Sequence, residues 1–241
     1  MDFTTASKRR AKTRAIRTPD LEDPANTMAT KTTHRRIETL LEKTEAAMKQ
    51  TAWFEAERHA VAALDLAIES GDHESAARAC LPLQEARRQR ALDAIDAAKG
   101  QVDVLDSVPA EIESVEAGVY LIEPNGVGAD ARRLRIAALQ LEVPVLVVCR
   151  EPVNRMGLVT IVAIGGSTVR TRVDPPADLE QPDLEWTLAA LEQLGDSAIE
   201  GLDPGLSGPQ RIDALRAVLD SVTDHERLHQ ALADALRAAA G

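Results

Sequence analysis

The stretch AGVYLIEPNGVGADARRLRIAALQLEVPVLVVC, residues 117–149, carries the clearest fold signal in the chain. Two nearly unbroken apolar runs, AGVYLIE (117–123) and VPVLVVC (143–149), flank an amphipathic segment, GADARRLRIAALQLE (128–142). A strand, a helix and a second strand joined by short turns form a βαβ unit, in which the two strands are parallel. Because both runs are apolar along their length, we expect the strands to be buried on both faces.

Further strand-like segments lie on both sides of this unit. They are residues 102–105, LVTIVAI (158–164) and STVRTRV (167–173). Gly165 and Gly166 separate the last two, which indicates a hairpin at the side of the sheet. In the last segment, Arg170 and Arg172 alternate with residues that suit a buried face, so one face is expected to be basic and exposed. Together these segments predict an α/β domain over residues 101–176.

Helical periodicity dominates residues 36–100. Apolar side chains recur at spacings of three and four from Ile37 onward, which is typical of one buried helix face. A second run of this kind ends at Gly71, because glycine provides a left-handed helix cap. A third run continues to Gly100, and Pro82 inside it predicts a kink or a break.

Small and apolar residues recur in the second helical run where two crossing helices would meet. They are Trp53, Ala56, Ala63 and Leu64, and Gly71 follows Ile37 by 34 residues. Over residues 36–99 this pattern resembles the tetratricopeptide repeat family, although the first helix lacks the Leu-Gly pair. The resemblance implies helical hairpins that act as a protein-interaction scaffold. A plain helical hairpin packed on the rest of the chain is the alternative.

Residues 177–241 form an acidic C-terminal region in which we expect helices. Amphipathic patterns predict helices over residues 183–194, 210–219 and 225–240. Residues 195–209 are rich in glycine and proline, so we expect a loop there.

The last of these helices contains HERLH, residues 225–229, which matches the pattern H-E-x-x-H. On a helix, His225 and His229 face one way and can share a zinc ion while Glu226 activates a bound water, as in zinc-dependent metallopeptidases. Of the residues after His229, only Asp234 is a conceivable third ligand. The alternative is two surface histidines on a helix.

The loop between the first strand and the helix of the βαβ unit is a second candidate site, for a nucleotide or another small molecule. Its candidate residues are Asn125, Gly126, Gly128 and Arg132 or Arg133. The glycines would let the backbone approach a phosphate at the helix start, and residues 149–151 would flank the same crevice. The loop lacks the third glycine of a dinucleotide fingerprint. An ordinary turn, with Asp130 capping the helix, is the alternative.

Four arginines form the densest basic patch outside the first 36 residues: Arg78, Arg87, Arg88 and Arg90. On a helix, Arg87 and Arg90 project to one side, where they would suit an anion or an acidic peptide. A solvated face neutralised by Glu85 and Asp93 is the alternative.

Composition excludes several classes of protein. The longest apolar run is far short of the roughly 20 residues of a membrane-spanning helix, so we expect no membrane association. Only five residues are aromatic, too few for a platform that stacks single-stranded nucleic acid. Cys80 and Cys149 form no paired motif, which favours buried thiols in a cytoplasmic protein.

The net charge of −11 is unevenly distributed along the chain. Residues 1–36 hold nine basic and four acidic side chains, so the rest of the chain is strongly acidic. We therefore expect nucleic acid to bind only through the basic first residues. We expect residues 1–35 to be a disordered basic leader, with translation from Met28 as an alternative explanation of the first 27 residues.

Three functions follow from these patterns. The first expectation is a non-enzymatic cytoplasmic protein that binds a partner protein through its helical front half and needs no cofactor. A zinc metallopeptidase that uses residues 225–229 is the first alternative. A small-molecule or nucleotide binder at residues 125–130 is the second.

Overall fold

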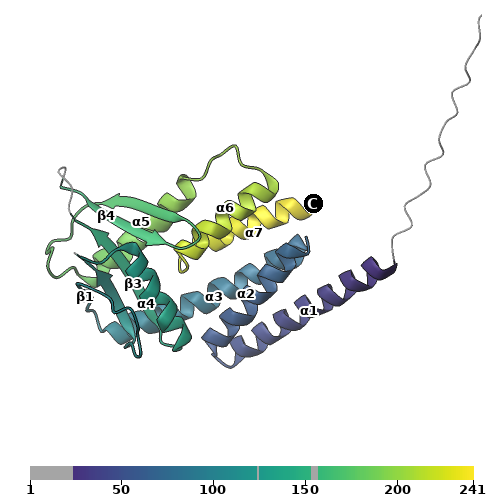
Figure 1. The fold of residues 1–241 in the computed structure, drawn as a ribbon, viewed down its shortest axis with the longest axis horizontal. Coiled ribbons are helices and arrows are strands. Elements are labelled where there is room, and N and C mark those ends of the chain that lie inside the picture. The colour runs from purple at the N-terminus through teal and green to yellow at the C-terminus, as the bar shows by residue number, and fades with distance from the viewer. Residues whose placement is uncertain (1–23, 124, 153–156) are drawn as a thin grey trace, which may run out of the picture.

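The computed structural model describes residues 24–123, 125–152 and 157–241 (Figure 1). Three helices come first: α1 (Pro24–Lys49), α2 (Trp53–Glu69) and α3 (His73–Ala98). The strands are β1 (Asp103–Leu105), β2 (Gly118–Ile122), β3 (Val145–Glu151), β4 (Val159–Ile164) and β5 (Thr168–Val173). The remaining helices are α4 (Gly128–Gln140), α5 (Leu184–Glu200), α6 (Gly208–Ser221) and α7 (Glu226–Ala240). The fold is therefore mixed α/β, as the sequence predicts.

The five strands form one mixed sheet in the order β1-β2-β3-β4-β5. β1, β2 and β3 are parallel, and α4 connects β2 to β3, which confirms the predicted βαβ unit. β4 and β5 are antiparallel and form the predicted hairpin at the side of the sheet. In β5 the arginines Arg170 and Arg172 are exposed and their neighbours are buried, so the expected basic face is also confirmed.

Both faces of the central strands are covered by helices. Every residue of β2 is buried. Val119 and Leu121 belong to a core shared with α3, α5, α6 and α7. Tyr120 and Ile122 point to the opposite face, where they pack with Leu134 of α4. This two-sided burial explains why the strand sequences are apolar without alternation.

Helix α3 lies at the centre of the molecule. It packs against α2 and α7 and also against β2 and β3 (Figure 1). Side chains such as Ala76 and Leu83 join the same hydrophobic core as Leu121 and Leu194. The regions 36–100 and 101–176 therefore share one core. The predicted boundary between them, at residue 100, lies just after the end of α3.

Two helix boundaries in the front half differ from expectation. α1 begins at Pro24 rather than near residue 36, so the last part of the expected disordered leader is helical. Residues 1–23 of that leader lie outside the described chain. α3 continues through Pro82, and a break is excluded there because Cys80 and Leu83 are buried on either side of the proline and hold the helix in place.

The acidic C-terminal region has its three predicted helices, but the end of α5 was wrongly predicted. The sequence pattern places this end at Leu194, whereas α5 continues to Glu200. Gly195 lies inside the helix, and the ring of His225 packs directly against it, so this position has no room for a side chain. A Cβ atom at Gly195 would lie 2.1 Å from Cγ of His225.

Candidate ligand pocket and buried charge cluster

A pocket of about 350 Å³ lies between α3, the sheet, α5 and the segment that joins α6 to α7. Most of its wall is apolar and comes from Leu92, Ile95, Leu146, Val148, Leu188 and Leu191. Charged side chains also line it, namely Arg88, Arg135, Glu192, Asp224, Glu226 and Arg227. Its volume and mainly apolar wall are typical of sites that bind small molecules.

The sheet itself helps to form this pocket. The ladder between β3 and β4 joins only the last three residues of β3, beginning with the pair Cys149 and Val162. Leu146 and Val148 precede this ladder and therefore face the pocket without a paired neighbour from β4. The early parting of the two strands leaves space that the helices do not fill completely.

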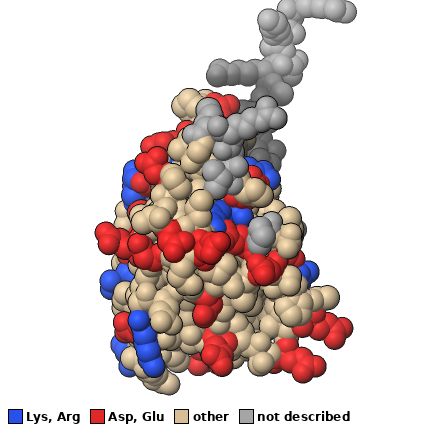
Figure 2. All heavy atoms as spheres, turned by 90° about the vertical axis from the view of Figure 1, so that its left-hand side faces the viewer, with Lys and Arg blue, Asp and Glu red and all other residues tan. Residues whose placement is uncertain are grey.

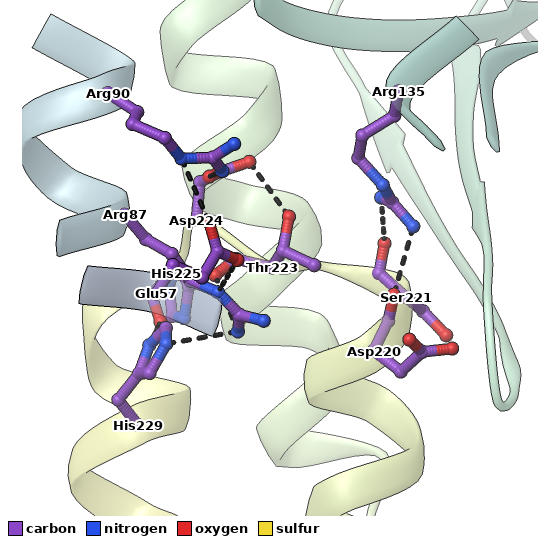
Figure 3. Close-up of polar contacts among 10 residues, drawn as sticks. All are labelled: Glu57, Arg87, Arg90, Arg135, Asp220, Ser221, Thr223, Asp224, His225 and His229. Atoms are coloured by element: carbon purple, nitrogen blue, oxygen red, sulfur yellow. Dashed lines mark hydrogen bonds and ion pairs between the residues drawn. The ribbon is translucent and has the colours of Figure 1, made fainter. Parts of the chain in front are cut away.

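Arg135 of α4 is a charged group in this wall whose guanidinium donates to backbone carbonyl oxygens. Its Nη1 and Nη2 atoms donate to the carbonyl oxygens of Ser221 and Asp220 at 2.8 and 2.9 Å, and so cap the end of α6 (Figure 3). Among the described residues, no carboxylate forms an ion pair with Arg135. Burial lowers the pKa of this guanidinium despite the nearby charges of Asp224 and Asp220.

A second group of polar side chains adjoins the pocket through Asp224, and we call it the buried charge cluster: Glu57, Arg87, Arg90, Asp224 and His229. The Glu57 carboxylate lies 2.8 Å from Nε of Arg87 and 3.0 Å from Nε of Arg90 (Figure 3). Glu57 is only 4% exposed. Burial alone would raise its pKa, but the two guanidinium groups outweigh burial and lower the pKa below its ordinary value.

The cluster ties four segments together. Arg87 of α3 also donates to the carbonyl oxygen of Thr223, at 3.4 Å. Arg90 lies over the ring of Phe54 in α2, 4.9 Å from its centre, and 3.9 Å from the Asp224 carboxylate. These contacts fix the segment between α6 and α7, which forms one side of the pocket. The solvated arginine face considered from the sequence is therefore wrong for Arg87 and Arg90, because both side chains are buried by the fold.

The ring of His229 is fully occupied by protein contacts. Its Nδ1 atom lies 3.0 Å from the carbonyl oxygen of His225 and must carry the proton to donate there. Its Nε2 atom then accepts from Nη1 of Arg87 at 3.3 Å. Burial, together with the charge of Arg87, lowers the pKa of His229 to about 3. The ring is therefore neutral and structural.

The HERLH motif does not form the arrangement that its spacing predicts. α7 begins at Glu226, so His225 precedes the helix and its ring points to α5 instead of lying beside the ring of His229. Glu226 is exposed at the rim of the pocket, 3.9 Å from Arg88. His225 and His229 are both buried, which also corrects the expectation of two surface histidines.

The loop at residues 125–130 is held by packing rather than arranged around a ligand. Residue 124 lies outside the described chain, and Asn125 is exposed. A Cβ atom at Gly126 would lie 2.3 Å from Ile122, and one at Gly128 would lie 2.9 Å from Ile164. Close approach to the sheet therefore explains both glycines. The Asp130 carboxylate accepts from the backbone N–H of Val127 at 2.8 Å, as expected of a helix-capping side chain.

Arg132 and the residues at the end of β3 do not converge on that loop. Arg132 is half-buried on α4, while Arg133 pairs with Asp130. Arg150 is buried, forms an ion pair with Glu123 and donates to the carbonyl oxygen of Leu179 at 2.6 Å. Burial raises the pKa of the Cys149 thiol to about 12, as it does for Cys80, so neither thiol is a ready nucleophile.

The surface adds little that points to a polyanionic partner. Figure 2 shows acidic side chains spread across one face of the molecule, with basic side chains in small groups among them. No broad basic patch covers the described part of this face. None of the described helices is long and apolar enough to cross a membrane.

Comparison of the chain with protein-family models, with curated proteins and with solved structures gives no match. The resemblance of residues 36–99 to tetratricopeptide repeats therefore stays a prediction.

Proposed function

We propose that this protein is a binding protein that holds a small, largely apolar anion in the pocket between α3, the sheet and α5. The observation that carries this proposal is an apolar pocket whose wall includes the guanidinium group of Arg135, which forms no ion pair with any residue that the structure describes. A hydrocarbon carboxylate has the two matching parts, an apolar body and one negative charge.

The apolar part of the ligand would be bound by burial against Leu92, Leu188 and Val148. Each buried methylene group contributes about 0.8 kcal/mol, so a chain of several carbons supplies useful affinity. The carboxylate would approach Arg135, whose burial already disfavours the charged form. An anion beside it would offset this penalty, and guanidinium groups bind carboxylates through paired hydrogen bonds.

The three roles expected from the sequence remain predictions. A partner protein would have to bind the outer surfaces of α1, α2 or α3, because the inner faces of these helices are packed in the core. Deletion of residues 36–99 would remove part of that core, so point variants on these surfaces are the appropriate test. A zinc peptidase would need His229 to leave Arg87.

The ligand proposal is tested by isothermal titration with linear carboxylates of about eight to twelve carbons and with the matching alcohols. Decanoate should bind the wild-type protein at least about tenfold more tightly than decanol, because a hydrogen bond to a charged group contributes about 1.5–3 kcal/mol. Leu188→Trp fills the pocket and should abolish binding. Leu139→Trp places the same ring on the exposed face of α4 and should leave binding unchanged.

Two results would overturn the proposal. One is no measurable binding of a carboxylate of any chain length, and the other is equal affinity of wild type and Leu188→Trp for decanoate. Arg135→Met distinguishes the contribution of the charge from that of the apolar wall. It should weaken the binding of decanoate and leave the binding of decanol unchanged. Unfolding by urea checks that each variant remains folded at the temperature of the titration.

A further inference from the structure

Three potential metal ligands meet where α5 passes the start of α7. Glu192 and Asp196 are four residues apart on α5, so their carboxylates project from one face of the helix. Nε2 of His225 lies 3.3 Å from an oxygen of Glu192 and 3.3 Å from an oxygen of Asp196. Among the described residues, these form the one group of three or more histidine, cysteine and acidic side chains close enough to hold a metal ion.

The ring of His225 is a second indication that this group of side chains can hold a ligand. Its side chain is only 1% exposed, yet neither ring nitrogen has a hydrogen-bond partner. A buried polar group without a partner is costly, and buried histidine nitrogens in folded proteins are normally satisfied. The ring cannot easily turn to find another partner, because it packs against the backbone of Gly195.

The separations match those between two ligands of one metal ion, and Nε2 of His225 forms no hydrogen bond with either carboxylate. A tetrahedral zinc ion with bonds of about 2.0–2.1 Å has neighbouring ligand atoms about 3.3–3.4 Å apart. Both measured separations from Nε2 of His225 are 3.3 Å. Two carboxylates would neutralise a divalent ion, and an imidazole beside carboxylates favours a transition metal over calcium or magnesium, which prefer oxygen ligands alone.

We infer that Glu192, Asp196 and His225 bind a divalent transition-metal ion, with zinc as the first candidate. This site differs from the one that the H-E-x-x-H pattern predicts, because Glu226 and His229 take no part in it. Glu192 and His225 also line the pocket, so the ion would lie at the pocket rim. The inference does not depend on the proposed ligand, since it uses none of the apolar wall and not Arg135.

Arg227 competes with a metal ion for this site. Its guanidinium forms an ion pair with the Asp196 carboxylate, and its side chain is 60% exposed. An exposed ion pair of this kind contributes little to stability, so a metal ion can displace it. Removal of this positive charge should therefore strengthen metal binding.

The test uses the full chain without a histidine tag, treated with a chelator and then titrated with zinc against a chromophoric competitor. Wild type should bind a single zinc ion, with magnesium as the negative control. Glu192→Gln should weaken zinc binding by at least about tenfold, given that even outer contacts of metal ligands have effects of 10–100-fold. Glu200→Gln, on the same helix and exposed, should bind as wild type does.

Arg227→Ala should bind zinc more tightly than wild type, which a merely adventitious surface site elsewhere would not show. Absence of zinc binding to wild type would overturn the inference, as would full affinity in Glu192→Gln. Loss of binding in His229→Gln with unchanged affinity in Glu192→Gln would assign the metal to the H-E-x-x-H residues instead. No carboxylate ligand is present in these titrations, so their result is independent of the decanoate experiment.

Discussion

Replacement of Glu57 by glutamine should be among the most destabilising substitutions in this protein that preserve the shape and volume of a side chain. Glutamine keeps the volume of the side chain but removes the negative charge that Arg87 and Arg90 share at 2.8 and 3.0 Å. The side chains of Arg87 and Arg90 are only 11% and 12% exposed, so their charges would be left without that counter-ion inside the fold. Among the described residues, the Asp224 carboxylate, 3.9 Å from Arg90, is then the one acidic group that forms an ion pair with either arginine.

Breaking a buried ion pair by removing one partner destabilises a protein by about 3–5 kcal/mol. For a chain of this length, each kcal/mol lowers the melting temperature by about 2–4 °C. We therefore expect a decrease of about 6–20 °C, measured by differential scanning calorimetry and by urea unfolding at pH 7.

Glu85→Gln is the matched control, because Glu85 pairs with Arg88 on the exposed side of α3. Its effect should stay below about 1 kcal/mol. A free energy of unfolding for Glu57→Gln within about 1 kcal/mol of the wild-type value would lie well below the expected loss. Such a result would show that the buried charge cluster does not hold the helices together.

Two further predictions concern the histidines of the last helical segment. The pKa of His229 is lowered to about 3, so below its unfolded pKa of 6.5 the unfolded chain binds a proton that the folded protein does not. The free energy of unfolding should therefore fall by up to about 1.4 kcal/mol for each unit by which the pH decreases from 6.5 to 5. In urea unfolding, His229→Gln should remove this pH dependence. His34→Gln, at an exposed position, should retain it. Gly195→Ala should destabilise the protein by about 1–3 kcal/mol and weaken zinc binding, because the new methyl group displaces the His225 ring. Glu200→Ala on the same helix should change stability by less than about 0.5 kcal/mol, and an equal effect of both substitutions would contradict the close packing at Gly195.

The parallel unit was predictable because its signal is local. Continuous apolar runs on either side of an amphipathic segment of residues 128–142 are compatible with few arrangements other than two buried parallel strands and a crossover helix. The end of α5 was not predictable in this way. Gly195 has the local appearance of a helix terminator, but its role is set by His225, thirty residues later in the chain.

The candidate site was harder to predict, because its contacts are between distant segments. Glu57 and Arg87 are thirty residues apart, and only the packing of α2 on α3 brings them together. The H-E-x-x-H pattern assumes that both histidines lie within one helix, whereas α7 starts one residue after the first of them. One available signal was Glu57 itself, a charged residue next to Ala56 and Ala60 on the apolar face of its helix.

Binding of an apolar anion in this pocket is tested by an amide nitrogen–proton correlation spectrum of the labelled protein, recorded during titration with decanoate. The largest shifts should arise from residues of the pocket wall, including Leu92, Val148 and Leu188, and from Arg135. Shifts confined to α1 and the outer surface of α4, or no shifts at saturating decanoate, would contradict the assignment of this pocket as a binding site for small apolar anions.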